Sequence, residues 1–282
     1  MKSLALALSL LLSACCLHPR SIHQSPPEPA ELRETSTRPA RGTVILVHGL
    51  NQRPSSLDPL ADEIRALGCN TYRITLHGHE DQGDEAFSDA AWEEDLVQAY
   101  RSVDRQLGSR PIYFLGYSLG GLLVTRVLDT HPELTPRGVI LLAPALSLRV
   151  LPQSGYLLTL FPPTTLSVPN VAPPRYRRFA STPLFWYRNI FHLYSATRTL
   201  HNPQRLASVP TVIVANPRDE LVSLSGLHEW LRDNQLALNW KIRAIRPAGV
   251  SPATPEHLII DQHALGLTEW ENLLASIKER LQ

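Results

Sequence analysis

The feature of this chain that most constrains its fold is an alternation of short apolar strands with amphipathic helices, which begins at Gly42. Residues 44–47 form an unbroken apolar run, as expected of a strand that is covered on both faces. An amphipathic stretch follows at residues 57–67 and ends at Gly68, a residue type that commonly closes helices. This alternation is typical of a mostly parallel sheet with helices on both faces, so we predict an α/β fold.

The same pattern continues to the C-terminus with one long interruption. Between Ala145 and Val209 the chain is rich in proline and then becomes apolar and aromatic at residues 184–193. Because a long structureless loop is unusual inside a compact domain, we predict an inserted lid at about residues 146–208. Elsewhere the periodicity predicts strands at residues 71–76, 112–115, 139–142, 211–215 and 240–245, and helices at residues 90–107, 119–128, 227–236 and 268–281.

Length and composition favour one large catalytic domain. The chain has 282 residues, of which 43% are apolar, enough to build a buried core. Its formal net charge is +1 and no run of Lys or Arg stands out, so we expect no nucleic-acid partner. Cys69 is the one cysteine beyond the N-terminal region, and we expect it to be a small buried residue rather than a reactive thiol.

The N-terminus has the organisation of a secretion signal. Lys2 precedes the apolar stretch 4–12, which is shorter than the roughly 20 residues needed to span a bilayer. Residues 12–15, Leu-Ser-Ala-Cys, resemble the lipobox of bacterial lipoproteins, which implies cleavage before Cys15 and lipidation of that residue. Cys16 fits less well, because a serine would then hold position −3. An ordinary signal peptide cleaved near Ala14, with cysteines there by chance, is the alternative.

These patterns divide the chain into a signal peptide at residues 1–14, a linker at residues 15–41 and a catalytic domain at residues 42–282. The linker is rich in Pro, Ser, Glu and Arg and has no apolar period. Acyl chains on Cys15 would tether the domain to a membrane surface. Since the residue after Cys15 is not Asp, the lipoprotein resemblance implies the cell envelope and its outer membrane, on the periplasmic side or at the surface.

The strongest chemical signal is residues 116–120, Gly-Tyr-Ser-Leu-Gly, which match the pattern Gly-x-Ser-x-Gly. They directly follow the strand predicted at 112–115 and lead into the helix predicted at 119–128. Such a sharp turn strains the serine and lifts its Oγ above the sheet, and a Cβ at either glycine would collide with the neighbouring backbone. The helix N-terminus also directs amides at a developing oxyanion. We therefore predict that Ser118 is a nucleophile, against the alternative of a tight turn without chemistry.

With this motif, residues 41–282 resemble the α/β-hydrolase family, and within it the lipase and esterase branch that includes the monoacylglycerol lipases. Residues 47–50, Val-His-Gly-Leu, are similar to the family's His-Gly turn, and residues 77–79, His-Gly-His, look like its Gly-His turn. The resemblance implies that the backbone amides of Leu50 and Leu119 form the oxyanion hole. It also implies that the histidine in the first turn braces the loop.

The resemblance also indicates where the catalytic acid stands. In this fold the chain order is nucleophile, acid, histidine, and the acid belongs after the strand that follows the lid. Residues 216–222, Asn-Pro-Arg-Asp-Glu-Leu-Val, are similar to the family's Gly-x-x-Asp-x-x-Val loop and put Asp219 in the acid's place. They depart from it in having Asn216 where Gly is commoner. Glu220 is the alternative acid.

Two histidines compete for the role of base, because both follow the last predicted strand. Residues 255–261 resemble the family's histidine followed by apolar residues and an acid, which favours His257. His263 is the alternative. With Ser118 and Asp219, His257 would support acyl transfer in two steps through an acyl-enzyme.

The predicted function is hydrolysis of carboxylic, lipid-type esters, with the lid aromatics favouring an acyl pocket. An acyltransferase or thioesterase could use the same triad, and a binding lipoprotein could keep the fold without the chemistry. We expect a small ester or lipid as substrate, a membrane contact through the anchor and a monomer. We expect no cofactor and no metal: His77 and His79 beside Glu80 and Asp81 could bind a cation, but the family's turn already accounts for them.

Overall fold

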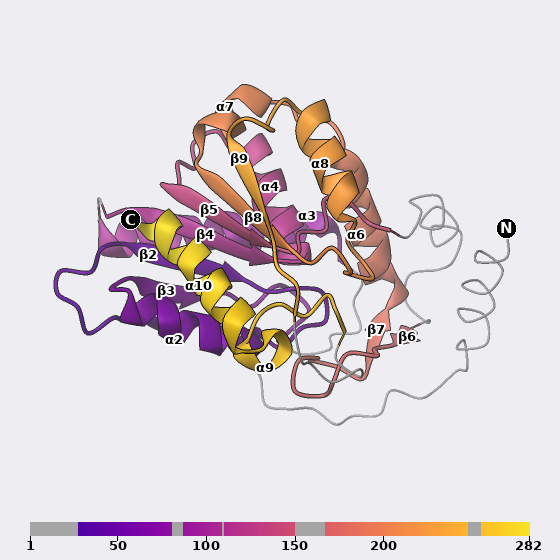
Figure 1. Ribbon diagram of the computed structural model, residues 1–282, viewed down its shortest axis with the longest axis horizontal. Coiled ribbons are helices and arrows are strands. Elements are labelled where there is room, and N and C mark those ends of the chain that lie inside the picture. The colour runs from indigo at the N-terminus through magenta and orange to yellow at the C-terminus, as the bar shows by residue number, and fades with distance from the viewer. Residues whose placement is uncertain (1–27, 81–86, 109, 150–166, 248–254) are drawn as a thin grey trace, which may run out of the picture.

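A seven-stranded sheet forms the centre of the molecule, in the order β1-β3-β2-β4-β5-β8-β9 (Figure 1). The computed structural model describes residues 28–80, 87–108, 110–149, 167–247 and 255–282. All neighbouring strands of this sheet are parallel except β1, which pairs with β3 in the antiparallel direction. The strands are β1 (Glu31–Arg33), β2 (Thr43–Val47), β3 (Asn70–Arg73), β4 (Ile112–Tyr117), β5 (Gly138–Leu142), β8 (Thr211–Ala215) and β9 (Trp240–Ala244).

Helices cover both faces of the sheet. Successive residues of β4 point to opposite faces, so Phe114 lies in one apolar cluster and Leu115 in the other, and both are fully buried. The predicted α/β-hydrolase architecture, a mostly parallel sheet between helical layers, is confirmed. One face carries α3 (Asp89–Leu107), α4 (Leu119–Thr130), α6 (Leu184–Ala196) and α8 (Leu224–Asp233), and the other carries α2 (Asp58–Ala66) and α10 (Leu267–Leu281).

Every strand and helix predicted from the apolar pattern is present, with ends that shift by a few residues. The strand predicted at residues 71–76 ends at Arg73, because the chain then turns away toward Gly78. Cys69 is buried and has no disulfide partner, as expected of a small buried residue. The described part of the chain has no helix with the length and apolarity that a membrane crossing requires. The remaining short elements are η1 (Pro54–Leu57), β6 (Ser167–Pro169), β7 (Ser181–Pro183), α7 (Pro203–Ser208) and α9 (Gln262–Leu265).

The predicted lid coincides with the segment between β5 and β8, of which residues 150–166 lie outside the described residues. In the described part, β6 and β7 pair as an antiparallel hairpin, and α6 follows. Two aromatic residues at the start of α6 belong to the hydrophobic core. Phe185 and Trp186 are 4% and 2% exposed and pack in the core against Phe87 and Trp92.

The end of the linker predicted at residues 15–41 is part of the folded domain. Glu31–Arg33 form β1 and extend the sheet beyond β3, although this part of the chain lacks an apolar period. Ionic contacts hold the strand: Arg33 pairs with Asp58 at 3.0 Å, and Arg73 pairs with Glu31 at 3.1 Å as well as with Asp58. The folded domain therefore begins before Gly42. The predicted signal peptide and Cys15 lie outside the described residues.

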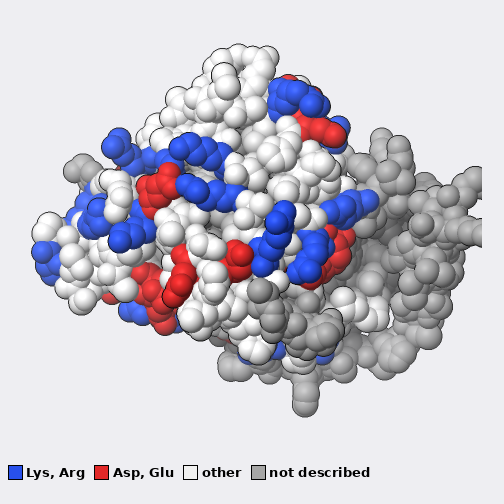
Figure 2. Space-filling model, viewed as in Figure 1, with Lys and Arg blue, Asp and Glu red and all other residues white. Residues whose placement is uncertain are grey.

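Charged side chains are mixed over the surface. On the face that Figure 2 shows, basic and acidic groups are interspersed, in keeping with the net charge of +1. The ionic cluster around Arg73 is more buried than most of the other ion pairs, since the Arg73 side chain is 8% exposed.

A comparison of two N-terminal deletions tests whether β1 belongs to the domain. A protein that starts at residue 35 loses the pairing with β3 and the Glu31 and Arg33 contacts, whereas one that starts at residue 28 keeps them. We expect the shorter protein to be less stable by about 1–3 kcal/mol, because several hydrogen bonds and partly buried ion pairs are lost. Thermal unfolding measures the difference. Equal melting temperatures would show that β1 contributes nothing.

Candidate active site

Ser118 occupies the turn between β4 and α4 in a strained backbone conformation. Its φ of 53° and ψ of −114° fall in a region that residues with a Cβ rarely adopt. Two of the hydrogen bonds that fix the turn connect it to the end of β5 and the residues after it: the amide of Ser118 donates to the carbonyl of Leu142 at 2.9 Å, and its carbonyl accepts from the amide of Ala145 at 3.1 Å. The β5 end of the sheet thus holds the serine in this conformation.

The two glycines of the motif are required by close backbone contacts. A Cβ on Gly120 would lie 2.2 Å from the carbonyl oxygen of Val47, and one on Gly116 would lie 2.6 Å from the carbonyl oxygen of Gly120. Backbone atoms cannot move away cheaply, so only glycine fits at either position. These are the collisions that the sequence pattern predicts.

His257 and Asp219 lie next to Ser118, although the three residues come from distant parts of the chain. His257 Nε2 is 2.9 Å from Ser118 Oγ, and His257 Nδ1 is 2.7 Å from Asp219 Oδ2. Because Asp219 accepts a hydrogen bond, Nδ1 carries the proton and Nε2 is left to accept the hydroxyl proton of Ser118. Asp219 and His257 are 1% and 7% exposed, so water competes little for these contacts.

The carboxylate of Asp219 is oriented by the backbone of its own loop. Its Oδ1 accepts hydrogen bonds from the amides of Leu221 at 2.8 Å and Val222 at 2.9 Å, which leaves Oδ2 for the imidazole. The alternative acid, Glu220, instead accepts the backbone amide of His257 at 3.0 Å. The alternative base, His263, lies on α9 with an exposed side chain. The structure therefore brings together the three residues that the sequence favoured.

Two residues to which the sequence assigned no role hold the loops together. The hydroxyl of Tyr117 donates to the carbonyl of His257 at 3.1 Å, and burial next to Asp219 raises the pKa of this phenol well above 10, so it stays a donor. Asn216, which replaces the commoner glycine, donates through Nδ2 to the carbonyl of Glu256 at 2.9 Å and to its carboxylate at 2.7 Å. These contacts join segments far apart in sequence, so no local pattern could indicate them.

The loop after β2 is braced by two buried neutral histidines. His48 donates through Nδ1 to the carbonyl of Gly49 at 2.8 Å and accepts the amide of Leu76 on Nε2 at 3.1 Å, while burial lowers its pKa to about 4. His79 accepts the amide of Asn51 on Nε2 at 2.9 Å, and burial lowers its pKa well below 6.5. Both rings must stay neutral to accept these amides.

The two amides expected in the oxyanion hole are available for a ligand. Leu50 lies in the braced loop, and Leu119 is the first residue of α4, where helix amides lack intrahelical acceptors. In the described part of the molecule, neither amide donates to a protein acceptor. The positive end of the α4 dipole also lies at this turn.

In the second turn, the ring of His79 is occupied by structural hydrogen bonds. Both ring nitrogens of His79 have backbone partners, Asn51 and His77. Within the described residues, no group of three or more His, Cys, Asp or Glu side chains could hold a metal ion. Asp81, the fourth residue considered for such a site, lies outside them.

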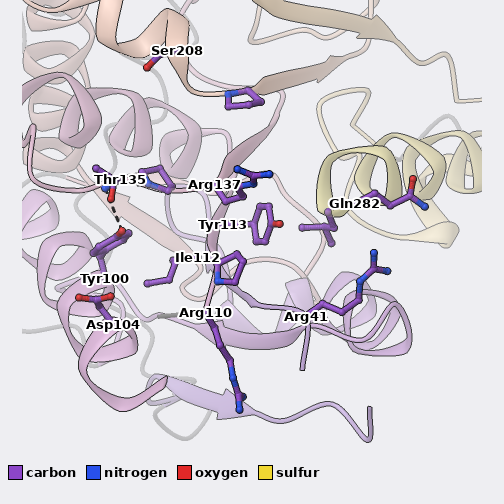
Figure 3. Close-up of a pocket in the computed structure, with 14 residues that line it drawn as sticks. Arg41, Tyr100, Asp104, Arg110, Ile112, Tyr113, Thr135, Arg137, Ser208 and Gln282 are labelled. Carbon is purple, nitrogen blue, oxygen red and sulfur yellow. Dashed lines mark hydrogen bonds between the residues drawn. The ribbon is translucent and has the colours of Figure 1, made fainter. Parts of the chain in front are cut away.

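A hollow of about 720 Å³ lies at the amino ends of the strands, opposite the carboxyl ends where the triad lies (Figure 3). It is lined by residues that precede or begin strands, among them Arg41 before β2, Ile112 at the start of β4, Arg137 before β5 and Pro210 before β8. Ser118 stands at the carboxyl end of β4, so this hollow is separate from the triad. Its rim is polar and holds several arginines.

Comparisons with known proteins place the chain in a family. Residues 38–239 match the family model Hydrolase_4, whose description is serine aminopeptidase, S33. The chain belongs to this family of serine hydrolases. The matched range contains Ser118 and Asp219 and ends before His257, so the position of the histidine rests on the geometry above. No curated protein matches this sequence.

Solved structures of lipolytic enzymes share the fold. A structure from work on LipS and LipT, two metagenome-derived lipolytic enzymes, is 16% identical, with 92% of this chain and 99% of that chain covered and a TM-score of 0.70. A soluble variant of monoglyceride lipase from Saccharomyces cerevisiae, in complex with a substrate analogue, is 14% identical over 95% and 98% of the chains, also at 0.70. The monoacylglycerol lipase of Paleococcus ferrophilus is 20% identical over 89% and 97%, at 0.64. These likenesses establish the α/β-hydrolase fold.

Substitutions at Ser118 test whether its backbone is strained. Glycine tolerates the observed conformation and alanine does not, so we expect Ser118→Gly to be more stable than Ser118→Ala by about 1 kcal/mol. Ser195, exposed on α6, serves as the control, and there glycine should be the less stable residue by about 1 kcal/mol. Chemical denaturation of the four variants gives the comparison. The same order at both serines would contradict strain at position 118.

Proposed function

We propose that the protein hydrolyses carboxylic esters, with Ser118 as nucleophile, His257 as general base and Asp219 as the residue that orients the base. One observation carries the proposal: a serine Oγ, an imidazole and a carboxylate are linked by hydrogen bonds of 2.9 and 2.7 Å. A buried imidazole between a hydroxyl and a carboxylate is the arrangement that activates a serine for attack.

The reaction would proceed in two steps. His257 Nε2 takes the hydroxyl proton as Ser118 Oγ attacks the ester carbonyl, and Asp219 stabilises the imidazolium that forms. The protonated imidazole then gives this proton to the leaving alcohol, which departs and leaves an acyl-enzyme. Water attacks the acyl-enzyme with His257 again as base, and the acid is released. The backbone amides of Leu50 and Leu119 would bind the oxyanion in both steps, and such a donor is typically worth about 3–4 kcal/mol.

The surroundings of the triad support an uncharged acyl group. An aminopeptidase must bind the free α-amino group of its substrate, for which a carboxylate is the usual partner. Among the residues that the structure describes, the carboxylates beside the triad are already engaged: Glu220 accepts the amide of His257, and Glu256 binds Asn216 and Arg218. The lipolytic enzymes among the structural neighbours support a lipid-type ester. A thioesterase or acyltransferase would use the same residues and differ in the acyl carrier or acceptor.

Matched histidine and serine variants test the proposed triad. We expect Ser118→Ala and His257→Gln to lower kcat/KM for a nitrophenyl acyl ester about a thousandfold or more, because nucleophile or base is lost. His263→Gln should keep the activity of the unaltered protein, since its side chain is exposed on α9. A fluorophosphonate probe should label the unaltered protein at Ser118 and leave Ser118→Ala unlabelled.

The outcomes separate the rival functions. Turnover retained in folded Ser118→Ala would overturn the assignment of the nucleophile, and an unlabelled native protein would favour a binding role without chemistry. Rates for an ester, a thioester and an aminoacyl anilide of the same protein distinguish the substrate classes. We expect the ester to react fastest, and a clear preference for the anilide would indicate an aminopeptidase.

We infer further that the mature protein is a monomeric lipoprotein, attached through Cys15 to a membrane of the cell envelope. The support is the apolar stretch of residues 4–12 followed by Leu-Ser-Ala-Cys. The folded domain begins near β1, so a short segment after Cys15 would connect it to the membrane. The outer membrane is the proposed location, since Asp does not follow Cys15.

Substitution of each N-terminal cysteine tests the anchor. In a diderm bacterium fed with labelled palmitate, we expect Cys15→Ser to lose the label and to leave the membrane fraction, because the acylated residue is gone. Cys16→Ser is the matched control and should stay labelled and membrane-bound. A label that persists in Cys15→Ser and disappears in Cys16→Ser would assign the anchor to the second cysteine, and no label in either would reject a lipoprotein.

A further inference from the structure

Asn51 directly follows the amide proposed to bind the oxyanion, and it is almost completely buried. Its side chain lies in the core of the loop after β2, with the residue 1% exposed. Its φ of 47° is left-handed, a conformation that Asn adopts more readily than most residues. Its amide donates to His79 Nε2 at 2.9 Å. The peptide between Leu50 and Asn51 is therefore fixed from one side by a buried neutral imidazole.

The side chain of Asn51 fixes the same loop from the other side, by hydrogen bonds to the insertion. Its Oδ1 accepts the amide of Phe179 at 2.8 Å, and its Nδ2 lies 2.7 Å from Thr182 Oγ1. Nδ2 also lies 3.1 Å from the carbonyl of Phe179 and 3.2 Å from that of Ser181. One amide side chain thus holds residues 179–182, which include the first two residues of β7 and lead toward the start of α6.

Backbone contacts extend this connection along the insertion. The amide of Arg178 donates to the carbonyl of Asn51 at 2.9 Å, and the amide of Arg53 donates to the carbonyl of Tyr176 at 2.7 Å. The hydroxyl of Tyr176 donates to the carboxylate of Asp261, with a shortest distance of 2.9 Å. Residues 176–182 therefore contact both the loop after β2, which holds Leu50, and the segment that follows His257.

We propose that Asn51 is a positioning residue, which holds the Leu50 amide in place for the oxyanion by fastening its loop to residues 176–182 of the insertion. This inference rests on the proposed function. Hydrogen bonds weaken steeply as the donor direction deviates, so a small rotation of this loop would weaken a bond that forms fully only in the transition state. The insertion then contributes to the rate of acyl transfer as well as covering the sheet.

Asn234 offers a matched control with the same chemistry away from the triad. It is 4% exposed, and its Oδ1 accepts the amide of Leu200 at 2.8 Å. Its Nδ2 donates to the carbonyls of Trp230 at 3.0 Å and Arg198 at 3.2 Å. Asn234 thus fastens the other end of the insertion to α8. Loss of either asparagine removes similar buried hydrogen bonds.

The experiment compares Asn51→Asp with Asn234→Asp. Aspartate keeps the shape of asparagine and its tolerance of a left-handed backbone. It replaces the NH2 donor with a carboxylate oxygen, which would face the oxygen atoms that accepted from Asn51. Complete titration with a fluorophosphonate gives the concentration of active sites in each variant. The rates with a nitrophenyl ester are then expressed per titrated site, and thermal unfolding reports stability. The inhibition constant of a trifluoromethyl ketone, whose serine adduct carries an oxyanion, is measured in parallel.

We expect kcat of Asn51→Asp to fall about 10- to 100-fold with KM nearly unchanged, because a displaced oxyanion donor costs less than a deleted one. The inhibition constant of the ketone should rise by the same factor. Asn234→Asp should lose stability and keep its kcat per titrated site. Thr182→Val removes one hydrogen-bond partner of Asn51 and should give a smaller fall in kcat. This variant replaces Asn51→Asp in the test if Asn51→Asp does not fold.

Two results would overturn the proposal: a native kcat per site in Asn51→Asp or in its Thr182→Val substitute, or an equal fall in Asn234→Asp. Either would reduce Asn51 to a structural role. Failure of the proposed function itself looks different, because the native protein would then escape the fluorophosphonate or Ser118→Ala would retain turnover.

Discussion

The hydrogen bond between Ser118 Oγ and His257 Nε2 is the contact on which the rest of the site depends. It exists because parallel strands deliver their following loops to one edge of the sheet: Ser118 follows β4, Asp219 follows β8, and His257 follows β9. In that sheet only β5 separates β4 from β8, so segments distant in sequence meet over a few strand widths. The parallel core therefore determines where the chemistry can occur.

Polar contacts rather than apolar packing define the loops of this site. His48 and His79 act as neutral acceptors for backbone amides, Tyr117 ties the nucleophile's turn to the histidine loop, and Asn216 ties the acid's loop to it. The folded pKa of His48 is lowered, so the unfolded chain takes up a proton first as pH falls below about 6.5. As the pH falls from that value to the folded pKa of about 4, this histidine therefore progressively lowers the stability of the folded state.

The sequence predicted most of the fold because the central strands are unbroken apolar runs and the helices have clear periods. It did not predict β1, a three-residue edge strand that is held by ion pairs and whose residues have the composition of a linker. Ser118 and Asp219 lie in local motifs, whereas His257 and His263 both follow β9 and only the path of the loop distinguishes them. Asn51 and Tyr117 gave no signal, since their partners lie far away in sequence. The composition of the α6 aromatics does not distinguish core residues from pocket residues, and Phe185 and Trp186 lie in the core.

A crystal structure of the protein after reaction with a fluorophosphonate would test the account most directly, because the adduct imitates the tetrahedral intermediate. The account predicts phosphorus bonded to Ser118 Oγ, His257 still paired with Asp219, and one phosphoryl oxygen within hydrogen-bond distance of the amides of Leu50 and Leu119. A phosphoryl oxygen directed away from both amides, or an adduct on any residue other than Ser118, would contradict it.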